Sequence, residues 1–331
     1  MERKIALLMD QENLDSLFDA AHRKRLTRLG NVVTVTKPGA LTPERSAALI
    51  EGADIAVTSW GCPPLDQAIL EQAPGLRLIM HAAGTVKRIV TPEVVNRGIR
   101  VSSANTALGQ RVAETALGLT IVSLKNIWQL ARDTREGEWG RNRPKVKELY
   151  GITVGVIGAG QSGGYYIELM RRFQVRLLVC DPALTEEQIR EMGAVKTDLE
   201  QLMRESDVVS VHAPAIPATD KMINGPLLQQ MKDDAILINT ARGSLIDEEA
   251  LVAELGKGRL WACLDVTNPE PPAPDHPFRT LPNVTLIPHI AGVVTNGLRS
   301  LGEFTVTELE AFSEGRPLNG TVQLARLDTL A

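Results

Sequence analysis

The stretch Gly151-Ile152-Thr153-Val154-Gly155-Val156-Ile157-Gly158-Ala159-Gly160-Gln161-Ser162-Gly163 decides the fold of this chain. Residues 153–157 are a short β-branched apolar run, which is typical of a strand buried on both faces. The run ends in a Gly-x-Gly-x-x-Gly motif, and an apolar pattern with helical spacing follows. The first glycine of such a motif allows a tight turn, the second lets a pyrophosphate approach the backbone, and the third lets helix and strand pack closely. The stretch therefore predicts a dinucleotide-binding turn at the N-terminus of a helix.

A second strand is predicted at residues 175–180, and it leads to Asp181, 18 residues after Gly163. At that spacing a carboxylate accepts hydrogen bonds from the adenosine ribose hydroxyls and repels a 2′-phosphate. NAD is therefore favoured over NADP as the cofactor. The alternative is an ordinary turn with a surface aspartate, because glycines also mark turns that bind nothing. The cofactor-binding residues predicted from this part of the chain are Gly158, Gly160, Gln161, Ser162, Gly163 and Asp181.

Length and composition set the class of protein. The chain has 331 residues, 44% of them hydrophobic and 23% charged, which fits two soluble α/β domains. A net charge of −4 indicates neither a nucleic-acid partner nor an anionic membrane, and no apolar run is long enough to span a bilayer. The N-terminus turns acidic too early for a signal peptide. Three distant cysteines favour core positions over a disulfide or a metal site, and the reducing cytoplasm as the compartment.

Apolar runs alternate with helix-like stretches along the chain, which predicts an α/β fold with two Rossmann-like, doubly wound parallel sheets. The strands predicted in the first part are 4–10, 31–36, 53–60 and 76–82. Those predicted in the second part are 153–157, 175–180, 208–213, 235–240, 261–266 and 284–288, the number found in a complete dinucleotide-binding domain. Residues 107–135 are predicted to form one long helix between the parts, and residues 293–315 another helix.

The fourth predicted strand runs into a loop, His81-Ala82-Ala83-Gly84-Thr85-Val86-Lys87-Arg88. Ligands bind at the carboxyl ends of strands in open α/β sheets. Small residues with free backbone N–H groups favour a carboxylate-binding loop at Gly84, Thr85 and Val86. The alternative is a simple turn before the next helix. His81 is ambiguous, and His22 is predicted to be a surface or loop histidine.

Three ionisable residues follow predicted strand ends in the second part: Arg242, Glu270 and His289. Hydride transfer to a carbonyl needs a proton donor, which His289 can be, and a carboxylate such as Glu270 favours the donor's imidazolium form. Arg242 presents a planar fork to a substrate carboxylate and carbonyl oxygen. Each residue also has an ordinary alternative: a surface ion pair for the arginine, a solvated loop carboxylate for the glutamate and a structural role for the histidine.

Together these motifs resemble the D-isomer-specific 2-hydroxyacid dehydrogenases, which include phosphoglycerate, glycerate, hydroxypyruvate, glyoxylate and lactate-forming enzymes. The resemblance covers most of the chain and is strong over residues 107–295. The motifs that carry it are the glycine motif with Asp181, Val211-His212-Ala213-Pro214, Asn239-Thr240-Ala241-Arg242-Gly243, Leu264-Asp265-Val266, Glu270-Pro271 and Pro288-His289.

The resemblance implies a substrate-binding role for Arg242, and His289 as the acid/base with Glu270 as its partner. It implies further cofactor-lining residues, namely His212, Ala213, Pro214, Thr240, Ala241 and Asp265, the last close to the nicotinamide carboxamide. It also implies a substrate domain of residues 1–103 and 294–331, with an NAD-binding domain of residues 104–293 inserted into it. The enzyme would be a homodimer through that insert. Separately, no residue is predicted as a metal ligand.

Two segments depart from the family's pattern. Where the family has Asn-x-Pro-Gly-x-Asn before Val-Ala-Glu, this chain has Ser103-Ala104-Asn105-Thr106-Ala107-Leu108. The loop at 84–86 lacks the common Gly-Val-Asp pattern, so the identity of the substrate does not follow. Separately, the large aromatic Trp139 in the polar loop 136–146 predicts either a contact with a partner subunit or local packing.

The sequence thus predicts the reversible reduction of a 2-oxo acid to a D-2-hydroxy acid with NADH. Arg242 and the loop at 84–86 would hold the substrate carboxylate, and domain closure would exclude water. One alternative is a non-catalytic NAD(H)-sensing protein, because the same fold serves in a transcriptional corepressor. Oxidation of formate or phosphite is disfavoured, because the formate enzymes carry Gln where this chain has Glu270.

Overall fold

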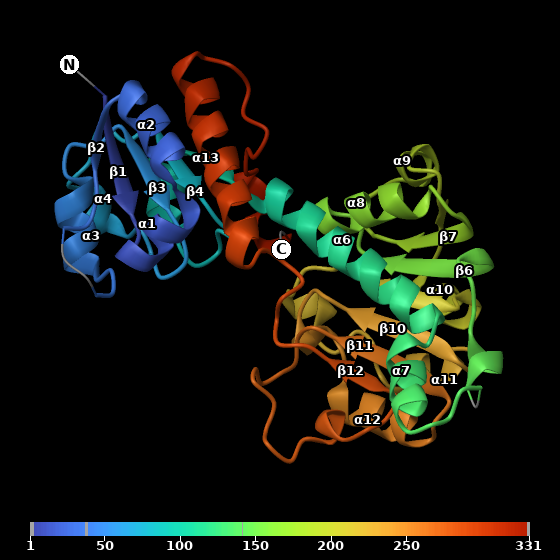
Figure 1. The fold of residues 1–331 in the computed structure, drawn as a ribbon. Coiled ribbons are helices and arrows are strands. Elements are labelled where there is room, and N and C mark those ends of the chain that lie inside the picture. The colour runs from blue at the N-terminus through green and yellow to red at the C-terminus, as the bar shows by residue number, and fades with distance from the viewer. Residues whose placement is uncertain (1–2, 37–38, 141, 330–331) are drawn as a thin grey trace. The chain divides into compact units, whose positions relative to one another are not determined.

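The computed structural model describes residues 3–36, 39–140 and 142–329. The chain divides into two compact units, one of residues 1–108 with 293–331 and the other of residues 109–292. Each unit contains one parallel sheet covered by helices, and the predicted α/β fold class is confirmed (Figure 1). Arg141, within the predicted loop 136–146, and residues 330–331, within the predicted substrate domain, lie outside the described residues.

The first unit has a five-stranded parallel sheet in the order β2-β1-β3-β4-β5. Its strands are β1 (Lys4–Leu8), β2 (Asn31–Val33), β3 (Ile55–Thr58), β4 (Leu78–His81) and β5 (Arg100–Ser103). Its helices are α1 (Gln11–Leu17), α2 (Ala20–Leu29), α3 (Pro43–Ile50), α4 (Gln67–Leu70), α5 (Pro92–Asn96) and α13 (Leu298–Ser313). The strand β5 was not predicted, because Val101 is its only apolar residue.

Alternate residues of β1 serve two different cores of this unit. Ala6 and Leu8 pack in a cluster with residues of the α3 and α4 region, whereas Ile5 and Leu7 pack in a second cluster that includes Leu309 of α13. All four β1 residues are almost completely buried. This is the pattern of a parallel strand that is covered on both faces, and it explains why the strand reads as a continuous apolar run.

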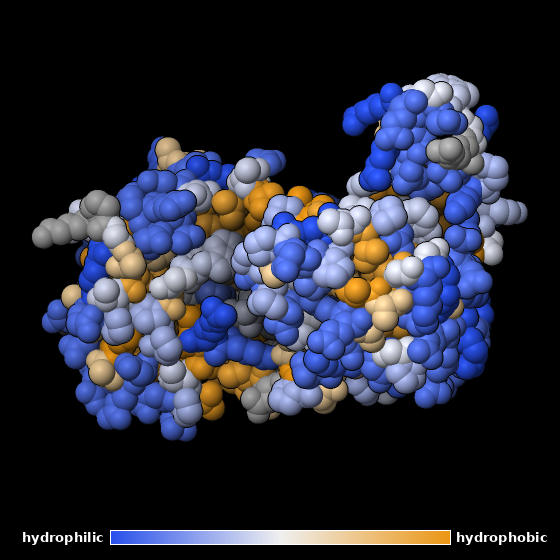
Figure 2. Space-filling view, turned by 90° about the horizontal axis from the view of Figure 1, so that it is seen from below, coloured by the Kyte–Doolittle hydropathy of each residue, from blue (hydrophilic) through white to orange (hydrophobic). Residues whose placement is uncertain are grey.

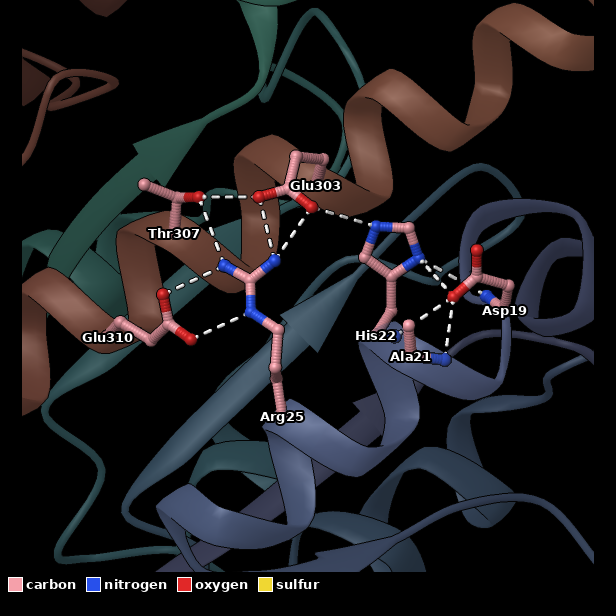
Figure 3. Close-up of polar contacts among 7 residues, drawn as sticks. All are labelled: Asp19, Ala21, His22, Arg25, Glu303, Thr307 and Glu310. Carbon is pink, nitrogen blue, oxygen red and sulfur yellow. Dashed lines mark hydrogen bonds and ion pairs between the residues drawn. The ribbon is translucent and has the colours of Figure 1, made fainter.

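Polar contacts tie α13 to α2, although the two helices lie at opposite ends of the chain (Figure 3). The Arg25 guanidinium contacts both carboxylate oxygens of Glu303 at 2.7 Å and both of Glu310 at 2.8 Å. These hydrogen bonds hold the pKa of each carboxyl below its usual range. His22 lies between Asp19 and Glu303 with only 7% of its surface exposed, so its predicted surface position was wrong.

A second tie joins α13 to the edge strand β5. The buried carboxylate of Glu308 accepts hydrogen bonds from the Ser102 hydroxyl at 2.6 Å and from the backbone N–H groups of Asn319 and Gly320 at 2.8 and 3.0 Å. The C-terminal segment thereby forms an antiparallel bridge between Thr321 and Ser102. This segment covers β5, the strand at the edge of the sheet.

The second unit has a seven-stranded parallel sheet in the order β12-β11-β10-β9-β6-β7-β8. Its strands are β6 (Tyr150–Ile157), β7 (Gln174–Cys180), β8 (Val195–Lys196), β9 (Val208–Val211), β10 (Ala235–Asn239), β11 (Leu260–Leu264) and β12 (Val284–Leu286). The covering helices include α8 (Gln161–Met170), α9 (Glu186–Glu191), α10 (Leu199–Glu205), α11 (Gly225–Gln230) and α12 (Glu248–Gly256). The predicted number of six strands was one too few, because β8 spans only two residues.

The predicted long helix over 107–135 is two helices, α6 (Asn105–Leu124) and α7 (Ile127–Arg135). The break falls at Asn126, whose φ of +51° lies in the left-handed region. Asparagine adopts that region more readily than other residues with a side chain, so it can end one helix and begin the next. The C-terminal helix is also shorter than predicted, because a 3₁₀ turn at Thr295–Gly297 precedes α13.

The surface is mixed in character. Hydrophilic residues predominate on the face drawn in Figure 2, and hydrophobic residues form separate groups among them.

Cys62 and Cys263 occupy buried core positions, and Cys180 is half-buried. Within residues 3–36, 39–140 and 142–329, no helix combines the length and apolar content that crossing a membrane requires.

Candidate active site

The glycine motif forms the loop between β6 and α8, at the carboxyl end of the sheet. Gly158 has a φ of +86°, and a Cβ atom there would lie 2.7 Å from the backbone nitrogen of Ala213. A Cβ atom on Gly163 would collide with the carbonyl oxygen of Gly158. A Cβ atom on Gly160, in contrast, would meet no described atom within 4 Å beyond its chain neighbours, and no described side chain caps the N-terminus of α8. The loop therefore offers open space and uncapped N–H groups to a diphosphate.

Asp181 follows β7, and its carboxylate reaches back to the glycine loop. One oxygen accepts the N–H of Ala159 at 2.8 Å, and the other accepts the N–H of Ala183 at 2.8 Å. The sheet order reverses at β6, which lies between β7 and β9. Such a switch point creates the crevice in which dinucleotides bind in open α/β sheets.

The turn after β9 lies on the other side of this switch point. The N–H of His212 donates to the carbonyl oxygen of Ile157 at 2.7 Å, which places the turn against the glycine loop. The ring of His212 is buried: its Nε2 lies 2.8 Å from the Ser210 hydroxyl, and the ring packs on Tyr166. Burial lowers the pKa of His212 to about 3. The ring of His212 is thus a neutral core group.

The loop after β10 is shaped by the side chain of Asn239. Its amide nitrogen donates to the carbonyl oxygen of Arg242 at 2.8 Å, and its amide oxygen accepts the N–H of Ala241 at 3.0 Å. The hydroxyl of Thr240 is buried and has no hydrogen-bond partner among the residues that the structure describes. A buried hydroxyl without a partner is costly, so this group is suited to a bound ligand.

Arg242 lies in this loop and is exposed. One of its Nη atoms donates to the carbonyl oxygen of Ala241 at 2.6 Å. The next residue, Gly243, packs directly on the backbone of Thr267, where a Cβ atom would collide. The loops that follow β10 and β11 are therefore in contact, which brings Arg242 to the same end of the sheet as Glu270.

The loop after β12 is held by Asp265, which is only 2% exposed. Its carboxylate accepts the N–H of Ile290 at 2.7 Å and the N–H of Ala291 at 3.1 and 3.2 Å. Burial raises the pKa of Asp265, and the two backbone hydrogen bonds act in the opposite direction. His289 lies directly before these residues and has a φ of +50°. Asp265 thus fixes the backbone that presents His289.

His289 and Glu270 form a pair. The Nδ1 atom of His289 lies 2.7 Å from Oε1 of Glu270, and the two side chains are 48% and 40% exposed. A carboxylate at Nδ1 keeps a proton on that nitrogen, so Nε2 is the nitrogen that can exchange a proton with another molecule. The structure thus brings together these two predicted residues from the ends of β11 and β12.

The loop predicted to bind a carboxylate lies in the first unit, after β4. No acceptor among the described residues pairs with the backbone N–H groups of Gly84, Thr85 or Val86. Their carbonyl side is occupied instead, because the Ser103 hydroxyl contacts the carbonyl oxygens of Ala83 and Gly84. The sequence did not predict this role of Ser103. The only signal was a small polar residue where the family's pattern has asparagine.

Comparison with known proteins places these features in a family. Residues 117–291, more than half of the chain, match the family described as "D-isomer specific 2-hydroxyacid dehydrogenase, NAD binding domain". The chain belongs to the D-isomer-specific 2-hydroxyacid dehydrogenase family. Its second unit therefore carries this family's NAD-binding domain, and the expected cofactor, NAD, is confirmed.

Relatives of this family member include named dehydrogenases and reductases. A D-3-phosphoglycerate dehydrogenase from Methanocaldococcus jannaschii is 32% identical over 311 residues, which are 93% of this chain but 59% of that protein. A glyoxylate reductase from Korarchaeum cryptofilum is 34% identical over 265 residues, 78% of this chain and 80% of that protein. The chain thus spans less than two thirds of the phosphoglycerate dehydrogenase and most of the glyoxylate reductase.

The fold of this family member is also found in solved structures. A phosphoglycerate oxidoreductase from Rhizobium etli superposes with a TM-score of 0.82 at 24% sequence identity, covering 97% of this chain and 98% of that one. This likeness establishes the two-domain Rossmann-type fold.

Proposed function

We propose that this protein reduces a 2-oxo acid to a D-2-hydroxy acid, reversibly, with NADH as the reductant. The observation that supports it most is the 2.7 Å contact between Nδ1 of His289 and Oε1 of Glu270, in the NAD-binding domain and at the carboxyl end of the sheet. A half-exposed imidazole that is oriented by a carboxylate is the arrangement a general acid requires. The names of the relatives agree with this chemistry.

His289 is the proposed acid/base. Glu270 holds the Nδ1 proton, so the imidazolium releases its Nε2 proton to the substrate oxygen and recovers it in the reverse direction. NADH bound at the glycine loop supplies the hydride. Arg242, which is exposed at the end of β10, is the proposed ligand of the substrate carboxylate and carbonyl oxygen.

The unpaired N–H groups of Gly84, Thr85 and Val86 are the second carboxylate-binding element that we propose. Backbone N–H groups that converge in a loop attract anions without any charged side chain. This assignment gives the first unit the role of substrate domain, as the resemblance implied for residues 1–103 and 294–331.

The residues proposed to hold NAD fit that cofactor in character. Gly160 and the uncapped α8 suit the diphosphate, Asp181 suits a ribose, and the buried Thr240 hydroxyl needs a partner. We propose that the other residues of the same turn also contact NAD, namely Gly158, Gln161, Ser162 and Gly163. The proposed contacts from other loops are Ala213, Pro214, Ala241 and Asp265. For His212 the contribution is limited to the backbone, because its ring is buried.

We also propose a homodimer that forms through the second unit. Trp139 is 82% exposed, so it does not pack locally on the described chain. Ile127, Trp128 and Tyr150 are exposed apolar residues of the same stretch. Exposed aromatic side chains of this kind are typical of interfaces. The proposed partner is a second copy of the chain.

The proposed compartment is the reducing cytoplasm, with which the three unpaired cysteines agree.

The experiment that tests the function measures NADH oxidation against a panel of 2-oxo acids, from small to aromatic, with His289→Ala beside the unaltered protein. We expect turnover on at least one acid and a loss of about a hundredfold or more in the variant, with NADH binding retained. Tight NADH binding without turnover on any acid would favour the NAD(H)-sensing alternative instead, which the names of the relatives do not favour.

A further inference from the structure

Ser103, the last residue of β5, contacts the carbonyl side of the loop at 83–86. Its hydroxyl oxygen lies 3.1 Å from the carbonyl oxygen of Ala83 and 2.6 Å from that of Gly84. The same hydroxyl accepts the N–H of Asn105 at 3.1 Å, at the start of α6. Ser103 is only 4% exposed, so no water competes freely for these contacts.

The position of Ser103 is itself fixed on both sides. Its N–H donates to the carbonyl oxygen of Gly320 at 2.8 Å, and the N–H of Gly320 donates to the buried Glu308. The following residue, Ala104, donates its N–H to the carbonyl oxygen of His81 at 2.9 Å. These contacts fix the Ser103 hydroxyl independently of the loop at 83–86.

His81, the last residue of β4, contacts the loop one residue further along. Its Nδ1 lies 2.9 Å from the Thr58 hydroxyl, and the ring is 3% exposed. Burial lowers the pKa of His81 to about 4, and a hydrogen bond to the backbone of Thr85 acts in the opposite direction. A hydrogen bond that acts in this direction is one in which the ring donates, so the acceptor is the Thr85 carbonyl oxygen.

Planar peptide geometry links these contacts to the ligand side of the loop. In a trans peptide the C=O of one residue and the N–H of the next point in opposite directions. Holding the carbonyls of Ala83 and Gly84 therefore aims the N–H groups of Gly84 and Thr85 away from Ser103. Holding the carbonyl of Thr85 does the same for the N–H of Val86.

We propose that Ser103 and His81 are positioning residues that orient three backbone N–H groups, those of Gly84, Thr85 and Val86, toward the carboxylate of the substrate. This inference rests on the proposed function, because it takes the 2-oxo acid as the ligand. It assigns a role to Ser103 at the position where the chain departs from its family's pattern, and a role to a buried histidine that takes no part in proton transfer.

The test compares Ser103→Ala with Ser102→Ala. Both variants lose one buried hydroxyl of β5, but the Ser102 hydroxyl bonds Glu308 and not the loop. We expect Ser103→Ala to raise KM for the 2-oxo acid about tenfold, with kcat and KM for NADH changed by less than about threefold. Both variants should lower the melting temperature by a similar amount, but Ser102→Ala should leave KM for the 2-oxo acid unchanged.

Two further variants keep the test decisive if Ser103→Ala does not fold. Ser103→Cys keeps a side chain of similar size with a weaker donor, and KM should rise by a smaller factor. His81→Phe keeps a ring without nitrogen atoms and should raise KM for the 2-oxo acid independently. Unchanged KM in folded Ser103 and His81 variants, with turnover by the unaltered protein, overturns this inference alone. Absence of turnover by the unaltered protein overturns the proposed function instead.

Discussion

Asp265 holds Ala291 by a forked contact in which both carboxylate oxygens accept one backbone N–H, at 3.1 and 3.2 Å. One of these oxygens also accepts the N–H of Ile290. The two anchored residues come immediately after His289. A buried carboxylate at the end of β11 therefore fixes the backbone of the loop after β12, which carries the proposed acid/base.

Replacing Asp265 by Asn should therefore impair catalysis through His289. An amide keeps only one oxygen acceptor. The NH₂ group that replaces the other oxygen then faces a backbone N–H donor, and this loss of a buried hydrogen bond costs about 1–3 kcal/mol. We expect kcat to fall at least about tenfold and the melting temperature to drop, measured by steady-state kinetics and thermal unfolding. A variant with unaltered kcat would mean that the His289 backbone does not depend on this carboxylate.

Glu270→Gln tests the charge of the proposed pair without removing its size. The glutamine oxygen can still accept the Nδ1 proton of His289, but the imidazolium loses its counter-charge. We expect reduction of the 2-oxo acid to slow about tenfold or more, measured by steady-state kinetics, because the proposed proton donor loses its charged partner. Activity equal to that of the unaltered protein would restrict Glu270 to a solvated loop position.

Asp181→Ala tests the preference for NAD. Loss of the carboxylate removes the proposed ribose acceptor and the repulsion of a 2′-phosphate, so KM for NADH should rise and the preference over NADPH should shrink about tenfold or more. Asp198→Ala is a control, because Asp198 caps α10 through its carboxylate but lies outside the glycine loop. An identical NADH/NADPH ratio in Asp181→Ala and the unaltered protein would remove Asp181 from the ribose site.

Two buried neutral histidines predict a loss of stability in mild acid. Burial lowers the pKa of His81 to about 4 and that of His212 to about 3, whereas an unfolded histidine has a pKa of about 6.5. The unfolded state therefore binds more protons below about pH 6.5, so stability is full above that pH and decreases as the pH falls toward 4. For His81 the loss amounts to about 3 kcal/mol.

Chemical denaturation between about pH 7 and pH 5 measures this slope before most carboxylates titrate. His212→Asn, which cannot take up a proton, should flatten the slope for the second unit. An unfolding free energy that stays constant over this range would show that both rings can be protonated in the folded state without cost.

Trp139→Ala should weaken the proposed homodimer. A large aromatic side chain that is 82% exposed in one chain loses substantial apolar contact when it is truncated in an interface. Trp60→Ala is the matched control, because Trp60 is 42% exposed in the first unit. Sedimentation velocity should show a shift toward monomer for Trp139→Ala alone, whereas an unaltered profile would leave Trp139 outside the interface.

The parts of the candidate site that could be predicted are those encoded by contiguous residues at strand ends. The glycine motif carries most of its strand, its turn and the start of its helix within 13 residues, and Glu270 and His289 each follow an apolar run. Parallel strands put their carboxyl ends at one edge, so the pairing of these two side chains follows from the alternation of strands and helices alone.

Contacts that depend on tertiary packing escaped prediction. The two-residue strand β8 has no hydrophobic period to detect, and β5 contains two buried serines whose partners lie on α13 and the loop at 83–86. His22 is polar in any sequence scale, yet it is buried between two carboxylates. The helix break at Asn126 lies inside a continuous apolar pattern, which gives no sign of a left-handed residue.

The first unit draws its helix α13 from beyond the whole of residues 109–292, and this order has a consequence for synthesis on the ribosome. Strand β1 is made before the second unit, but Leu309 and its neighbours, which cover one face of that sheet, are made only after it. The second unit is contiguous and can fold as soon as it has emerged. One apolar face of the first sheet therefore stays uncovered while residues 109–292 are made, and a chaperone that shields it would act during that interval.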